Sequence, residues 1–102
     1  MRRVRYSVDF VRQLDNLLAQ GEPKFGARVI DQKRELIYNT IERRLAASPK
    51  REPDPVLDLC VYSIAKTPFL AVYEFDDDEV RVFFLLHGGQ DRREIDVADF
   101  EW

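Results

Sequence analysis

The chain has 102 residues, of which 45% are hydrophobic, and it carries a net charge of −3. This length fits one domain, residues 1–102, with a core that it can bury without disulfides or metals. No apolar run approaches the roughly 20 residues that cross a bilayer, and no apolar signal segment follows the basic start. We therefore expect a cytoplasmic protein without a membrane partner, and the acidic balance argues against direct binding of nucleic acid.

The single cysteine, Cys60, and the single histidine, His87, limit the chemistry that the chain can perform. One cysteine forms no intrachain disulfide, and a structural zinc site needs about four ligands of the Cys or His type. We therefore expect no metal and no cofactor. A thiol nucleophile with histidine as its base is formally open, but no activating motif surrounds Cys60, and cysteines are commonly buried.

The N-terminal segment predicts a short strand followed by a helix. Apolar and polar residues alternate over residues 3–8, as they do in a half-buried strand. Ser7 is a suitable N-cap, and Asp9 is well placed near a helix N-terminus. From Phe10 onward the apolar residues recur at helical spacing, and Gln20-Gly21 ends the helix.

A second helix is expected to begin at Glu22-Pro23, where a proline in the first turn does no harm. It runs to Ala47, and Ser48-Pro49 ends it. Because the connection to the first helix is short, the two helices are expected to pack as an antiparallel hairpin.

The hydrophobic period changes from 3.6 to 2 after a proline-containing loop at residues 50–55. Strands are expected at residues 57–64, 69–75 and 80–87, separated by turns at 65–68 and 76–79. The last strand is nearly all apolar, which predicts burial on both faces or a central position. The expected fold is α+β: an N-terminal strand, an antiparallel helical hairpin on one face of the sheet, and a three-stranded antiparallel meander (β-α-α-β-β-β).

This layout resembles the ParE/RelE toxin superfamily over residues 3–93. The stretch from Ser7 to Leu14 resembles the family's strand-to-helix junction. The C-terminal half resembles the family more specifically, through Ala71 to Phe75, the acidic turn, Val80 to His87, and Gly88 to Arg93. The resemblance implies a ParE-like (plasmid stabilisation) toxin of a type II toxin–antitoxin system. Its partner would be a cognate ParD-like antitoxin, a small DNA-binding protein with a disordered C-terminal segment.

Two differences from the family's usual sequence pattern bear on which of the family's activities to expect. ParE-like members poison DNA gyrase, and RelE-like members cut messenger RNA on the ribosome. Family members often carry a basic residue just after the strand tyrosine, here Tyr73, and another on the apolar strand that leads to the histidine. This chain has Glu74 and Phe84 at these two positions. Cleavage needs positive charge around the scissile phosphate. The resemblance therefore favours a non-enzymatic, gyrase-binding toxin, with a RelE-like endoribonuclease as the alternative and a non-toxic partner-binding relative as a second alternative.

The resemblance implies a target-binding surface at the end of the last strand. Its residues are His87, Gln90, Asp91, Arg92 and Arg93. No catalytic residue is expected. The structural alternatives remain open: His87 can cap the strand and stabilise the tail, and Asp91 to Arg93 can form a solvated charge cluster.

The antitoxin is expected to bind the helical hairpin and the tail, either as a helix in a groove or as a strand added to a sheet edge. The apolar residues expected to contact it are Leu14, Leu18, Val29, Leu36, Phe100 and Trp102. The polar and aromatic tail, residues 94–102, can equally fold back on the sheet as an extra short strand. A phosphate-facing patch of Arg2, Arg3, Arg5, Arg43 and Arg44 is the other possibility, but no stacking aromatics interleave with these arginines, so solvated surface is the favoured interpretation.

Overall fold

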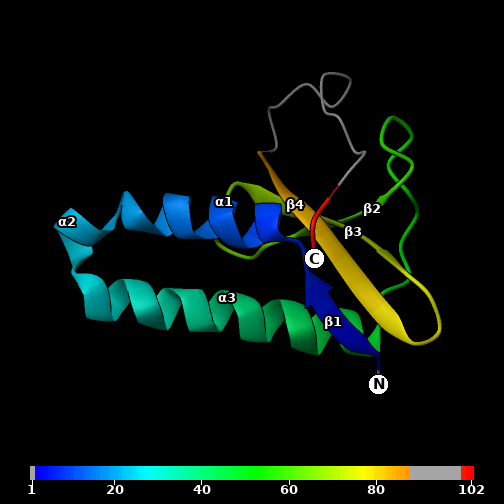
Figure 1. Cartoon of the computed structure of the whole chain (residues 1–102), viewed down its shortest axis with the longest axis horizontal. Coiled ribbons are helices and arrows are strands. Elements are labelled where there is room, and N and C mark those ends of the chain that lie inside the picture. Colours follow the sequence, from blue (N-terminus) through cyan, green and yellow to red (C-terminus); the bar gives the residue numbers. More distant parts are fainter. Residues whose placement is uncertain (1, 88–99) are drawn as a thin grey trace.

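The computed structural model of the chain describes residues 2–87 and 100–102. A helical hairpin packs on one face of a four-stranded sheet and extends well beyond it (Figure 1). The elements in chain order are β1 (Arg3–Tyr6), α1 (Val8–Ala19), α2 (Glu22–Phe25), α3 (Ala27–Ala47), β2 (Cys60–Ser63), β3 (Phe69–Phe75) and β4 (Glu79–His87). The α+β class and the order of helices and strands agree with the prediction, except that two helices, α2 and α3, stand where one was expected.

The sheet has the strand order β1-β4-β3-β2. Strands β2, β3 and β4 form the expected antiparallel meander, whereas β1 pairs with β4 in parallel. The sheet is therefore mixed. The apolar strand β4 lies between β1 and β3, which confirms the central position predicted from its composition.

The first helix begins and ends where the sequence predicts. The Ser7 side chain accepts a hydrogen bond from the backbone N–H of Phe10 at 3.0 Å, and the helix ends at its C-cap, Gln20. The continuous second helix is a wrong prediction. Gly26 has φ of +84°, which separates α2 from α3. Glycine reaches this conformation without a steric penalty.

Two strands are shorter than expected. In each case a side chain hydrogen-bonds to the neighbouring backbone, which then forms a turn or the start of a helix instead of a strand. The strand predicted at residues 57–64 begins only at Cys60. The Asp54 carboxylate accepts hydrogen bonds from the backbone N–H groups of Val56 and Leu57, at 2.9 and 3.2 Å, and so forms a turn there. The strand predicted at residues 3–8 ends at Tyr6, since Ser7 caps α1.

A β-bulge explains how β4 is apolar along its length. The register with β3 passes from Val72 opposite Phe84 to Tyr73 opposite Val82, so Phe83 has no partner. The extra residue reverses the alternation of side chains. Val82 therefore lies in the core beneath the helices, and Phe84 lies in a second cluster.

The chain thus has two hydrophobic clusters. The larger one joins the helices to the sheet, with Phe10, Ile41, Leu45, Tyr73, Val80 and Val82 among its most buried members. The smaller one comprises Leu57, Val72, Phe84 and Leu86, with Leu59, Val61, Leu70, Phe83 and Phe100 packed against it. Because helices cover only one face, the loop before β2 and the C-terminal residues cover the other.

Two polar side chains complete the exposed edge of β4. Strand β1 pairs with β4 only as far as Val82. Beyond it, the Ser7 hydroxyl donates to the Phe83 carbonyl. The Gln13 amide donates to the Leu85 carbonyl at 3.3 Å and accepts from the Leu85 N–H at 2.9 Å. Backbone groups that would otherwise lack partners at the strand edge are satisfied in this way.

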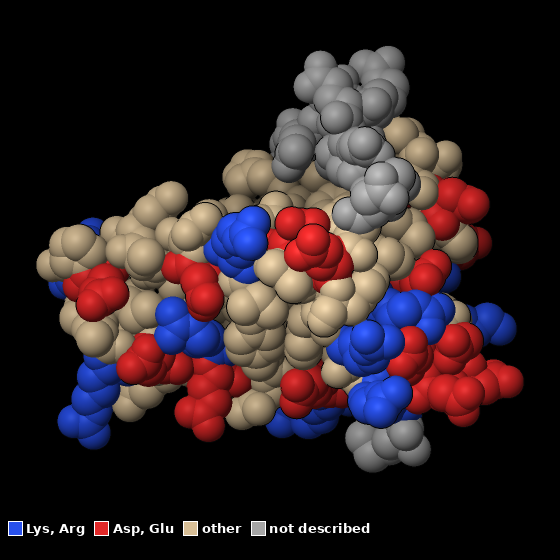
Figure 2. All heavy atoms as spheres, in the orientation of Figure 1, with Lys and Arg blue, Asp and Glu red and all other residues tan. Residues whose placement is uncertain are grey.

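The surface mixes charges of both signs. Figure 2 shows Lys and Arg side chains gathered near β1, with Asp and Glu beside them. No helix of the described residues is long and apolar enough to cross a membrane.

Candidate functional site

The β3–β4 hairpin carries an ion-pair cluster centred on Arg81. Its guanidinium lies 2.8 Å from Glu74, 2.9 Å from Asp76 and 2.8 Å from Glu79. Hydrogen bonding from Arg81 lowers the pKa of Asp76 to about 2, and it also lowers the pKa of Glu79. Three carboxylates therefore engage this cation. Glu74, the first of the two positions at which the sequence departs from the ParE/RelE pattern, is opposite Arg81 in the strand register.

Phe84 is the second position at which the sequence departs from the ParE/RelE pattern. Its side chain is 6% exposed and belongs to the smaller hydrophobic cluster. Its ring stacks on Phe100, with a centroid separation of 5.7 Å. Neither Glu74 nor Phe84 supplies positive charge for a reacting phosphate.

His87, the first of the predicted target-binding residues, lies exposed at the end of β4. Its ring meets the edge of Phe69 at 5.7 Å, and Phe69 is its register partner on β3. It lines a cavity of about 290 Å³ with Gln13, Asn16, Leu17, Phe69 and Leu85. The other predicted target-binding residues, Gln90, Asp91, Arg92 and Arg93, lie outside the described residues.

Cys60 and His87 do not form a nucleophile–base pair. Cys60 is opposite Tyr73 and His87 is opposite Phe69, four residues apart on β3, which is roughly 13 Å along a strand. Strand β3 also separates β2 from β4. Burial raises the pKa of the Cys60 thiol, which donates to the Arg51 carbonyl. Among the described residues, no group of three or more His, Cys, Asp or Glu is placed to hold a metal.

The residues expected to bind an antitoxin divide into buried and exposed ones. Leu14 and Leu18 are 3% and 6% exposed and belong to the core. Val29 and Leu36, on α3, are 47% and 64% exposed. We leave the two buried leucines out of the partner surface, because helix packing already covers them.

Residues 100–102, the last of the tail, fold back against the sheet as one of the two alternatives predicts, but they do not form the extra short strand expected there. Phe100 and Trp102 each contact Phe83, with ring centroids 5.2 Å apart. The Val8 N–H donates to the Glu101 carbonyl at 2.7 Å, beside the start of α1. Trp102 remains 41% exposed, so the contacts anchor the tail without burying it.

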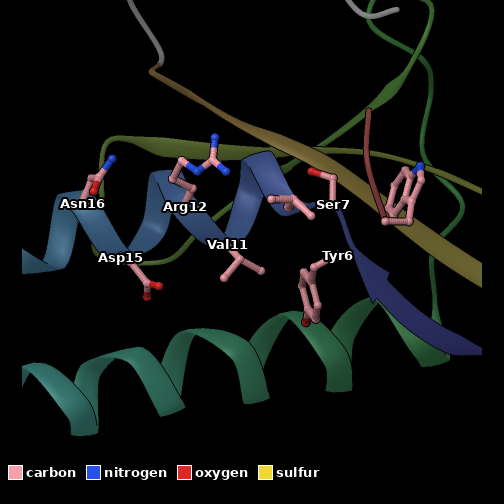
Figure 3. A pocket seen from close by; sticks show the side chains of 8 residues that line it. Tyr6, Ser7, Val11, Arg12, Asp15 and Asn16 are labelled. Atoms are coloured by element: carbon pink, nitrogen blue, oxygen red, sulfur yellow. The ribbon is translucent and has the colours of Figure 1, made fainter. Parts of the chain in front are cut away.

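A shallow pocket of about 520 Å³ lies beside this anchored tail, between β1, α1 and Trp102. In Figure 3, Val11 and Asp15 point toward α3, whereas Arg12 and Asn16 point to the other side of α1. Asp15 is paired with Arg34 of α3 at 3.1 Å. The pocket therefore presents a mixed, open surface rather than a set of converging groups.

The N-terminal arginines face the acidic turn. Arg3 and Arg5 lie 3.4 and 3.5 Å from Glu79. Arg2 donates to the Asp76 carbonyl and stacks on Phe75. Much of the positive charge near β1 is therefore balanced within the chain, which favours the interpretation as solvated surface.

The fold and these sites define an α+β domain with ParE-like topology. A chain of a solved structure, the chromosomal ParDE TA system from P. aeruginosa, is similar to this chain with a TM-score of 0.68. The two are 13% identical, and the match covers 85% of this chain and 96% of that one. This likeness confirms the predicted fold. No family model matches the sequence, and no curated protein does.

Sequence reasoning missed Gln13, Lys33 and Lys66 as site residues. Gln13 holds the backbone of Leu85, within two residues of His87. The two lysines line a cavity of about 130 Å³ between α1, α3 and the turn that joins β2 to β3. Each is a single polar residue in a helix or turn, and no local pattern distinguishes it from ordinary solvated surface.

Proposed function

We propose that the chain is the toxin of a type II toxin–antitoxin pair and that it acts by binding a protein. The ParE-like fold supports a toxin of this class. The proposed target is DNA gyrase, and the proposed partner is a ParD-like antitoxin with a disordered C-terminal segment.

One observation supports a non-enzymatic toxin: neither of the two positions where a nuclease would place a cation holds one. Glu74 pairs with Arg81, and Phe84 is buried in the smaller hydrophobic cluster. A phosphoryl-transfer site stabilises developing negative charge with preorganised cations or donors. An inhibitor of a protein target needs only a complementary surface, and the proposed surface lies at the exposed end of β4, at His87.

Inducible expression in a bacterial host tests this proposal. Filamentation with DNA-damage signalling is expected, because a poisoned gyrase leaves broken DNA. Immediate arrest of translation with cut messages would support the nuclease instead. Normal growth in the absence of any antitoxin would exclude both and leave a non-toxic partner-binding relative.

A pair of matched variants tests the placement of the target surface. Arg92→Ala with Arg93→Ala is expected to remove toxicity and keep antitoxin binding. Arg43→Ala with Arg44→Ala, an equal loss of charge at the end of α3, is expected to remain toxic. Full toxicity of the first pair would refute the proposed target surface.

A further inference from the structure

Three residues near the C-terminal end of the chain help to close the helix-free face of the sheet. Phe100, Glu101 and Trp102 lie beside the start of α1 and the strand β1 (Figure 1). We call residues 100–102 the strap. The strap forms no helix or strand of its own, so tertiary contacts rather than secondary structure hold it in place.

The aromatic side chains of the strap sit on a seat that the β-bulge builds. The rings of Phe100 and Trp102 each lie 5.2 Å from the ring of Phe83, and Phe100 also stacks on Phe84 at 5.7 Å. Consecutive side chains of a regular strand point to opposite faces, yet Phe83 and Phe84 contact the same ring. The bulge at Phe83 changes the alternation and so makes this possible.

The middle residue of the strap supplies a backbone acceptor to α1. The Glu101 carbonyl accepts a hydrogen bond from the Val8 N–H at 2.7 Å. Val8 is the first residue of α1, and the first N–H groups of a helix have no acceptor within the helix. Protection of the Val8 N–H from solvent therefore reports directly on the strap.

The contacts that hold the strap are few and lie near the surface. Trp102 is 41% exposed, and Arg5, which lies over its ring at 5.7 Å, is also 3.5 Å from Glu79. Exposed ring contacts and one hydrogen bond each contribute little, whereas ordering three residues has an entropic cost. Regions of this kind open at a lower free energy than the whole fold.

We propose that residues 100–102 are a releasable strap, which opens while the rest of the chain stays folded. In the closed state, Phe100 and Trp102, which the sequence predicts to meet a partner, are engaged with Phe83. In the open state both aromatic side chains leave the sheet, and the seat at Phe83 and Phe84 is uncovered. A partner that uses these aromatic side chains therefore binds the open fraction of the chain alone. The strap is a property of the chain itself, whatever its target.

Native-state hydrogen exchange of the full chain, read by NMR, tests the proposal through three backbone amides. Val8 donates to the strap, and Val82, fully buried in the central strand β4, reports on global unfolding. Leu85 is the control at the edge of β4, because its N–H donates to the Gln13 side chain instead of the strap. Val8 is expected to exchange at least about 100-fold faster than Val82, and low concentrations of urea should not change its rate, since opening the strap exposes little surface.

Removal of the strap's aromatic rings supplies the second comparison. In Phe100→Ser with Trp102→Ser, the Val8 amide is expected to exchange within about threefold of the rate of an unstructured peptide. The amides of Leu85 and Val82 should stay protected. The matched control is Phe25→Ser with Val56→Ser, which removes two exposed apolar side chains elsewhere and should leave Val8 protected.

Three results would overturn the proposal. The first is exchange of Val8 in the wild-type chain that is as slow as that of Val82 and equally steep in urea, because the strap would then open only with the whole fold. The second is a Val8 amide without protection in the wild-type chain. The third is loss of protection at Leu85 or Val82 in the strap variant. The conservative variant Trp102→Phe should keep Val8 protected, and its failure to do so would also count against the ring contacts.

Discussion

Ser7 joins the start of α1 to the edge of β4, and its removal should be costly. Its side chain is fully buried, accepts from the Phe10 N–H at 3.0 Å and donates to the Phe83 carbonyl. Loss of a serine N-cap costs about 1 kcal/mol, and loss of the donor to the part-buried Phe83 carbonyl costs about 1 kcal/mol more. Ser7→Ala should therefore lower the free energy of unfolding by about 2 kcal/mol, or Tm by roughly 10 °C for a domain of this size.

Urea unfolding followed by circular dichroism measures this loss. Ser63→Ala serves as the control, because Ser63 is exposed on the edge strand β2 and should change stability by less than about 0.5 kcal/mol. The m-value should not change, since the same surface is exposed on unfolding. A stability of Ser7→Ala equal to that of Ser63→Ala would refute the role given to the Ser7 hydroxyl.

Three further measurements test other parts of the structure. Gln13→Ala should lower the free energy of unfolding in urea by about 1–2 kcal/mol, because the two hydrogen bonds between the Gln13 side chain and the Leu85 backbone are lost. Gln32→Ala on the exposed side of α3 should change it little, and equal effects would contradict the edge role of Gln13. Acid should weaken the Arg81 cluster. Hydrogen bonding from Arg81 holds the pKa of Asp76 at about 2 in the folded chain, below its ordinary value of 3.8, so the stability from this group is present above pH 4 and lost as pH falls toward 2. In Asp76→Asn, the free energy of unfolding should therefore fall less steeply between pH 4 and 2 than in the wild-type chain. An equal fall in both would count against the ion pair. Phe100→Ala should shift the emission of the single tryptophan, Trp102, to longer wavelength, and unchanged emission would contradict the docked tail.

The sequence predicts helices and strands well where local signals, such as capping residues and hydrophobic alternation, determine the structure. The N-cap at Ser7, the helix end at Gln20 and the strand Phe69–Phe75 follow from capping and from period-2 alternation. The central position of β4 follows from its apolar run. These features depend on neighbours in the chain, so a single sequence contains them.

Features that depend on distant contacts could not be predicted in this way. The bulge at Phe83 and the parallel pairing of β1 with β4 are set by packing between elements. The break at Gly26 was missed because glycine also occurs within helices, and only its φ shows the change of direction.

The candidate site shows the same limit. The single histidine could be singled out from the sequence, but its cavity joins residues of α1, β3 and β4. Leu14 and Leu36 have equal hydrophobicity in the pattern, yet one is 3% exposed and the other 64%. Exposure is a property of the assembled fold, and it decides which apolar residues can meet a partner.

The central proposal is that the chain acts by binding a protein target rather than by cutting RNA. A supercoiling assay with purified gyrase and relaxed plasmid DNA, run beside a ribosome-bound messenger RNA cleavage assay, tests it most directly. We predict that the purified chain stops supercoiling, that prior addition of the antitoxin restores it, and that the messenger RNA stays intact. Unaffected gyrase together with cut messenger RNA would contradict the account.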